Sequence, residues 1–398
     1  MEVVRTDIEA KAARLLAGPR GRALCAAVAG LDAHRLLHGL TQPTSAVKLD
    51  AVDTQQTGGP RWPPAGWETL RRRHRLADAI ARPTLDHVVA EHVAAVDLQV
   101  LAAVEDDLAL VTCLVEAVND VLFFDDTRLL DGALESTADL LAPVAEAVVC
   151  APAASWWWTP TDRTAQRWLR SVARPTQPPP GEAAGALAAW AADDTATESR
   201  SVHMVPFPAR GRSPRFTGTW WARPLGRGLV CSTRTLPSVA AVGLAVMEDG
   251  PSSDVLEIWE LVPSASATVA EIDGPAAWCE LVEAFPREVT FSRRHDWWRW
   301  TGYEGRWFIP DWPQVAKAFD AVHVSVAGYL ETAYRALPAV AGATCLAGWD
   351  PDVTIWLSDI AAAHWVATWD GAVGANAFRT ANHPWIAGGR TTPDMRRR

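Results

Sequence analysis

Lysine, tyrosine and net positive charge are all scarce in this chain. Its 398 residues include only three lysines and three tyrosines, and 47 acidic side chains outnumber 37 basic ones to give a formal charge of -10 at pH 7. Proteins that bind nucleic acids through their phosphates carry a basic surface instead. The composition therefore argues against nucleic acid as a partner.

Closely spaced cysteines and long apolar runs are also missing. The six cysteines lie far apart, whereas zinc sites need ligand pairs and disulfide frameworks belong mainly to short secreted chains. The N-terminus is charged and lacks the apolar stretch of a signal peptide. Acidic residues interrupt the apolar regions 84–122 and 133–151, so neither is expected to span a membrane. We expect a cytoplasmic protein with reduced thiols and no membrane partner.

Familiar catalytic signatures are absent as well. The sequence has no G-x-S-x-G, no G-x-x-x-x-G-K-[ST], and no G-x-G-x-x-G after an expected strand. Serine-hydrolase, phosphate-loop and dinucleotide-fold chemistry therefore lose support.

Two polar groups have the residue types, but not the spacing, of metal sites. Asp125, Asp126 and Asp131 could hold magnesium through carboxylate oxygens, but the position three residues after the pair is leucine, and a helix end with a polar turn is the simpler interpretation. His87 and His92 are five residues apart, which separates their rings around a helix. We expect no metal site.

The sequence does contain a change of residue pattern near residue 150. Apolar positions recur every three or four residues over 1–150, which predicts a helical domain with a break near Glu105–Asp107 and an N-cap at Thr84. The Pro- and Ala-rich range 151–200 predicts a connector with a short helix. The remaining range, 201–398, mixes strand-like runs with short helices, which predicts an α+β domain. Strands are expected within 215–224, 228–236, 240–248, 254–263, 267–273, 320–326, 343–349 and 353–357, and helices within 275–285 and 312–320.

Nineteen of the 21 tryptophans lie beyond residue 150, several of them within 292–312. Most should belong to the core, because tryptophan buries a large area. Trp297 and Trp298 are adjacent, however, and adjacent residues of an extended strand face opposite sides. The exposed ring would form a surface with nearby cations that suits an anionic planar ligand or a protein partner. The ligand-binding candidates on this surface are Arg293, Arg294, His295, Trp298, Arg299 and Tyr303.

The strings SRRHDWW, DAVHVS and GWDPDVTIWL carry a resemblance over roughly 218–358. The chain resembles a group of actinobacterial proteins of unassigned function, and this resemblance implies a domain boundary but no chemistry. The pattern is also similar to that of ADP-ribosyltransferase-like, NAD-consuming domains. In such domains an arginine grips the pyrophosphate and a carboxylate steadies the developing positive charge on the ribose.

That similarity implies site residues in this chain. Ser232, Thr233 and Arg234 would bind the anionic ligand, and His323 lies on an expected strand. The late strand within 353–357 lacks the glutamate of the pattern, so Asp350 and Asp352 are the candidates to replace it. A structural alternative makes these two aspartates turn-forming residues, in which case Asp352→Asn should leave the melting temperature nearly normal.

Two functions remain open at this point. One is an enzyme, a transferase or hydrolase acting on a nucleotide-like substrate, with NAD as the candidate and a pocket formed by 232–234, 293–299 and 323. The other is a non-catalytic interaction protein, with the helical domain as partner-binding module on a tryptophan-rich scaffold.

Overall fold

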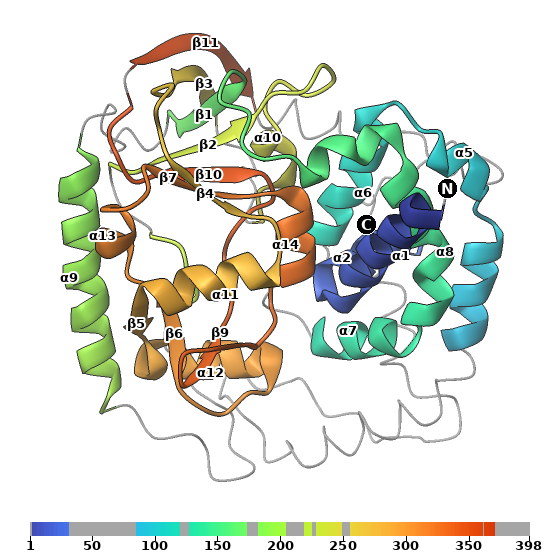
Figure 1. The fold of residues 1–398 in the computed structure, drawn as a ribbon, viewed down its shortest axis with the longest axis horizontal. Coiled ribbons are helices and arrows are strands. Elements are labelled where there is room, and N and C mark those ends of the chain that lie inside the picture. The colour runs from blue at the N-terminus through green and yellow to red at the C-terminus, as the bar shows by residue number, and fades with distance from the viewer. Residues whose placement is uncertain are drawn as a thin grey trace, which may run out of the picture.

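The computed structural model describes residues 2–31, 85–119, 127–172, 182–203, 219–224, 228–248, 255–360 and 362–370. Helices from the N-terminal third gather on one side, and two sheets with their covering helices occupy the other (Figure 1). The expected α+β class is confirmed.

The N-terminal third is helical, as expected, but its helices are shorter than the sequence suggested. The break expected near 105–107 exists, because a turn over 103–106 separates two helices. A second break lies at Asp97, whose side chain caps the helix that follows it. The helical range 132–149 is divided at Thr137, while Thr84 lies outside the described residues. The elements are α1 (Glu2–Ala17), α2 (Pro19–Val28), a helix over 85–94, α5 (Leu98–Ala102), α6 (Asp107–Asn119), α7 (Thr127–Ser136), α8 (Ala138–Cys150) and the 3-10 helix η1 (Pro152–Trp158).

A seven-stranded sheet organises the rest, in the order β11-β3-β1-β2-β10-β7-β4. Only the β4–β7 pair is parallel among these neighbours. Its strands are β1 (Gln166–Ser171), β2 (Val230–Arg234), β3 (Val255–Val262), β4 (Val269–Ile272), β7 (Ala321–Val324), β10 (Val353–Trp356) and β11 (Ala362–Asp370). The range 151–200 is thus not a bare connector, because it supplies η1, an inner strand of this sheet and the long helix α9 (Ala183–Ser201).

Burial along the strands explains where polar side chains need partners. All four residues of β7 and all four of β10 are buried, because both faces of these inner strands are covered. His323 lies in the middle of β7, and a buried imidazole must find hydrogen-bond partners.

The segments between β4 and β7 and between β7 and β10 together build a second layer. A four-stranded sheet, in the order β5-β6-β9-β8, packs beneath α11, and α11 also contacts β4 of the large sheet (Figure 1). The elements are β5 (Pro286–Glu288), β6 (Trp307–Pro310), β8 (Leu337–Ala339), β9 (Gly342–Thr344), α11 (Pro275–Ala284), α12 (Thr290–Thr301), α13 (Trp312–Val315) and α14 (Val326–Thr332).

One expected strand is wrong, because the range 240–248 contains the short helix α10 (Gly243–Val246). Of the strand expected within 215–224, only 219–224 are described, and these residues form no strand. The conformation expected around Trp297 is wrong as well, because α12 is helical.

Helix α9 holds α12 in place through two acidic side chains. Val289, the N-cap residue of α12, offers no side-chain cap, and Glu198 of α9 replaces it by accepting from the backbone N–H groups of Phe291 and Ser292 at 2.7 and 2.8 Å. Asp194 of the same helix pairs with Arg293 on α12 at 2.6 Å. A remote helix therefore supplies the cap that the local sequence lacks.

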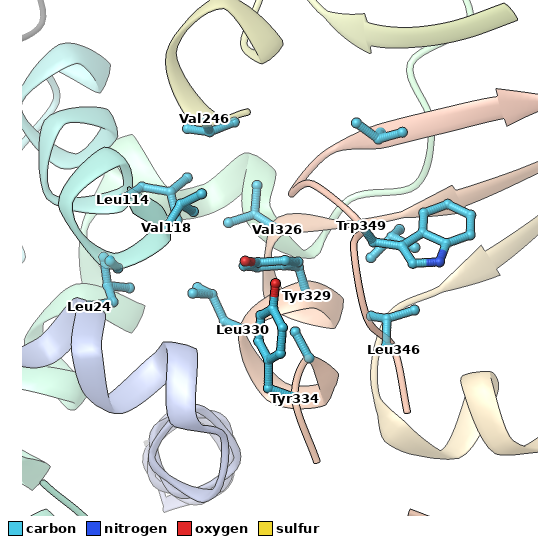
Figure 2. Close-up of a cluster of buried hydrophobic side chains, with 14 of the residues drawn as sticks. Leu24, Leu114, Val118, Val246, Val326, Tyr329, Leu330, Tyr334, Leu346 and Trp349 are labelled. Carbon is cyan, nitrogen blue, oxygen red and sulfur yellow. The ribbon is translucent and has the colours of Figure 1, made fainter. Parts of the chain in front are cut away.

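One hydrophobic core runs from the N-terminal helices into the sheet region. Leu24 of α2 and Leu114 of α6 belong to the same buried cluster as Val326 and Leu330 of α14 (Figure 2). Gly18 makes this approach close, since a Cβ there would lie 2.0 Å from the carbonyl oxygen of Leu330. The sequence Gly18–Pro19–Arg20 thus starts α2 directly against α14.

In the described part of the chain, no single helix has the length and apolar character needed to cross a membrane. Only α8 and η1 taken together pass that test, and they meet at an angle of 88°.

Candidate functional site

The residues expected to bind and react lie in three separate places. Ser232, Thr233 and Arg234 lie on β2, His323 lies on β7, and Asp352 directly precedes β10, the strand between them. Asp350 belongs to a different cluster, near Glu248. The candidates of α12 lie beside α9 and the small sheet.

His323 is the centre of a buried chain of charges. Its Nδ1 lies 2.5 Å from Oε2 of Glu271, and its Nε2 lies 3.4 Å from Oδ1 of Asp352. Asp352 in turn pairs with Nε of Arg234 at 2.7 Å. Burial lowers the pKa of His323, but hydrogen bonds to Asp352 and Glu271 raise it by more, so the net shift is upward. The imidazolium therefore sits between two carboxylates, and the four charges alternate in sign.

Every nitrogen of the Arg234 guanidinium is already bound. Besides Asp352, it donates to the hydroxyl of Thr159 at 2.9 Å and to the carbonyl of Pro160 at 3.2 Å. The hydroxyl of Thr233 donates to Asp352, and Ser232 donates to Gln166. The side chains of Ser232, Thr233 and Arg234 thus link neighbouring segments through hydrogen bonds. They have few donors left for a phosphate group.

Asp352 occupies the left-handed region at φ 57°, which fits the turn expected before β10. Its carboxylate does more than shape that turn, since it accepts from the backbone N–H of Arg234 and lies against His323.

The aromatic and cationic surface expected on 293–303 is buried. Arg293, Arg294 and His295 of α12 are buried, and Trp297 is fully buried and donates its indole N–H to the carbonyl of Trp220. Trp298 is partly exposed, and Tyr303 packs edge-on against Trp307. The backbone of Arg299 lies in α12, while its side chain lies outside the described residues. The structure does not bring these residues together with 232–234 and 323.

A second polar cluster, centred on Glu248, lies where the N-terminal helices meet the sheet region. Oε1 of Glu248 accepts from the hydroxyl groups of Tyr329, at 2.7 Å, and Tyr334, and from Nη2 of Arg20 at 3.2 Å. Figure 2 shows the two hydroxyl groups turned toward one another, with α2 and α6 on one side and α14 on the other. Arg20 also donates to the carbonyls of Ala117 and Val118 at the end of α6.

The second carboxylate of this cluster is Asp350. Its Oδ1 accepts the backbone N–H of Glu248 at 2.9 Å, and its Oδ2 accepts from Nη1 of Arg223 at 2.8 Å. Cys231 lies close enough to interact electrostatically with Arg223 and Asp350. Cys231 is exposed, yet desolvation by surrounding protein raises the pKa of its thiol.

The environment of Glu248 favours its neutral form. Burial raises the pKa of Glu248 above its usual 4.5, the charge of Arg20 opposes this, and Asp350 adds to the rise. Burial also raises the pKa of both tyrosines, so they remain hydrogen-bond donors. Because Oε1 already accepts three donors, Oε2 is the oxygen that can hold or release a proton. The side chain is 12% exposed, so this proton can be exchanged with a ligand or with water.

Sequence reasoning missed most of this cluster. Two of the three tyrosines of the chain converge on one carboxylate, but they approach it from α14 and its end, while Arg20 comes from α2. The spacing of these residues along the sequence does not predict that they meet. Among the described residues, no three His, Cys, Asp or Glu side chains form a group that could hold a metal ion.

No family model, curated protein or solved structure matches the chain significantly.

Proposed function

We propose that the protein is an enzyme, a hydrolase or transferase, in which Glu248 transfers a proton to or from a small substrate. The observation that supports this most is the environment of the Glu248 carboxyl group. Three donors hold Oε1, Oε2 is free of donors among the described residues, and burial raises the pKa. Such tuning is typical of general acids and bases.

The His323 chain is the weaker candidate for the reacting group. His323 and Asp352 are each about 1% exposed, and each contacts charged partners. In this proposal His323, Asp352 and Arg234 hold β2, β7 and β10 together, and Asp350 orients Arg223 and the backbone of Glu248. Glu248 would replace the late glutamate of ADP-ribosyltransferase-like domains, which the strand within 353–357 lacks.

Nucleotide-like substrates, with NAD first, remain the class to test. Wild-type protein would be incubated with NAD, ATP and ADP-ribose, and products would be separated by chromatography. We expect turnover of one of them, and a loss of at least 100-fold in Glu248→Gln, the lower range for general acid–base catalysis.

Glu331→Gln is the matched control. Glu331 is another buried acid with a raised pKa, it lies on α14, and its ion pair is with Arg14, which is not part of the Glu248 cluster. Turnover equal in both variants, or unchanged in Glu248→Gln, would contradict the assignment.

The alternative function, a non-catalytic interaction protein, is favoured by one feature of β11. Trp365 and Val366 are 56% and 45% exposed on this strand, which has only β3 as a neighbour among the described strands. Trp365→Ser should abolish a protein–protein interaction that depends on this strand, and it should leave turnover unchanged. Light scattering of the wild type, alone and mixed with fractionated cell extract, would show whether any complex forms.

A further inference from the structure

Three consecutive residues, 159–161, connect the N-terminal helices to the large sheet. They follow η1, which contacts α6, α8 and α14, and they lie shortly before β1. They form no helix or strand, and Thr159 and Pro160 are exposed. The position of this segment therefore depends on contacts with side chains of the sheet.

Arg234, at one end of the buried chain of charges, binds the start of the segment. Its guanidinium donates to the hydroxyl of Thr159 at 2.9 Å and to the carbonyl of Pro160 at 3.2 Å. It also lies over the ring of Trp156 in η1, 5.1 Å from the ring centroid. One side chain of β2 thus holds both η1 and the residues that follow it.

Glu271, at the other end of the chain of charges, binds the next residue. Its Oε1 accepts the backbone N–H of Thr161 at 3.0 Å, while its Oε2 lies 2.5 Å from Nδ1 of His323. The same four charges therefore bind 159–161 twice, once from β2 and once from β4.

The two ends of the chain respond differently when His323 loses its proton. The charged groups that face His323 are Glu271 from β4 and Asp352 from the turn before β10, and Arg234 lies behind Asp352. Arg234 and Asp352 remain an ion pair, whereas Glu271 loses the positive charge beside it and is repelled by the carboxylate of Asp352. The side chain of Glu271 is 31% exposed and the other three are at most 7% exposed, so Glu271 is the one that can turn toward water. The N–H of Thr161 then loses its acceptor.

We propose that the chain of charges is a pH-sensitive switch, in which protonated His323 holds 159–161 on the sheet and neutral His323 releases it at Thr161. Burial lowers the pKa of His323, but the hydrogen bonds to Asp352 and Glu271 raise it by more, so the net shift is upward from 6.5. The segment is therefore fully held below pH 6.5 and is released as the pH rises through the folded-state pKa.

Amide hydrogen exchange measures this contact directly. Exchange of the full-length protein would be followed by mass spectrometry at residue resolution from pH 6 to 9, and corrected for the intrinsic pH dependence of exchange. The protection of Thr161 should fall by about tenfold or more over this range, as expected when a hydrogen bond to a charged group is lost. Thr164 is the internal control, because Asp162 of the same local turn accepts its N–H. This readout needs no turnover and is independent of Glu248.

Two variants separate the switch from a general loss of stability. His323→Gln should make the protection of Thr161 independent of pH, at the level that the wild type reaches at pH 9. Glu271→Ala, on the edge strand β4, should leave Thr161 unprotected at every pH. Glu260→Ala is the matched control, since Glu260 is a partly exposed strand residue paired with Arg167, and it should behave as the wild type.

Three results would overturn the inference. They are protection of Thr161 that stays constant from pH 6 to 9, protection that falls equally at Thr164, and protection that survives Glu271→Ala.

Discussion

At the scale of residues, the buried ionisable groups around His323 and those around Glu248 differ in how completely they are paired. Around His323, each positive group faces a carboxylate, and the chain Glu271–His323–Asp352–Arg234 is neutral overall. Around Glu248, donors outnumber acceptors and two Nε–H groups lack partners among the described residues. A complete network stabilises a fold, whereas an incomplete one is suited to a ligand.

The raised pKa of His323 makes part of the stability depend on pH. Its folded-state pKa lies above the unfolded value of 6.5, so the stabilisation is fully present below pH 6.5 and is lost as the pH rises through the folded pKa. Urea midpoints measured from pH 6 to 9 should fall with rising pH in the wild type. His323→Gln should be less stable at pH 6 and should show a smaller dependence.

His87→Gln is the control, because His87 is a surface histidine 70% exposed in its side chain. A wild-type midpoint that stays constant over this range, or that falls equally in His323→Gln, would contradict the charged state of the imidazole.

Asp352→Asn should destabilise the fold by about 3–5 kcal/mol, the usual result of removing one partner from a buried ion pair. Asparagine could still accept from the backbone of Arg234, but it would leave Arg234 and His323 without their shared negative charge. A turn-forming role alone, considered from the sequence, would leave the protein nearly as stable as the wild type. Asp97→Asn is the matched control, since Asn caps a helix about as well as Asp and Asp97 is an exposed N-cap. Urea denaturation decides between these results.

At the scale of elements, the sequence predicted those with a clear local pattern and missed those set by remote contacts. Alternation in VLEIWELV predicted β3, and the apolar runs AVHV and VTIW predicted β7 and β10. The helix over 290–301 was missed because remote residues of α9 hold it: Asp194 pairs with the buried Arg293, and Glu198 accepts from the backbone of Phe291 and Ser292. The meeting of Arg20, Glu248 and Tyr329 was hidden for the same reason.

Substituting Gly18 tests whether the close packing of α2 against α14 positions Arg20 in the Glu248 cluster. Gly18→Ala should lower stability by more than 1 kcal/mol, since the new Cβ would lie 2.0 Å from a backbone oxygen of α14. It should also displace Arg20 and so weaken any activity that depends on Glu248. Gly185→Ala is the control, because Gly185 lies inside α9 with nothing within 4 Å of the added Cβ, and it should stabilise the protein by about 0.5–1 kcal/mol. Equal effects of the two substitutions on the urea midpoint would contradict this account of the contact.

At the scale of the whole molecule, a helical domain over 1–150 and an α+β domain over 201–398 remain a prediction. Leu24, Leu114 and Leu330 share one buried cluster across that boundary. Truncations such as Leu330→Ala typically cost 2–5 kcal/mol in such a core.

This shared core predicts that both parts unfold together. Thermal unfolding followed by far-ultraviolet circular dichroism reports the helices, and tryptophan fluorescence reports the region beyond residue 150, where 19 of 21 tryptophans lie. The two transitions should coincide and should shift equally in Leu330→Ala. Helix loss that precedes the fluorescence change would instead support two independent domains, and proteolysis between 150 and 194 should then release them.

The proposal that Glu248 transfers a proton is tested most directly by titrating its carboxyl group. Protein labelled with carbon-13 at glutamate carboxyl groups would be titrated by NMR, and Glu248→Gln would identify the signal of Glu248. We expect this carboxyl to titrate above 4.5, because burial and Asp350 outweigh the charge of Arg20. A signal that titrates at or below 4.5 would show a permanently ionised partner of Arg20, and it would contradict the assignment of Glu248 as the proton-transfer group.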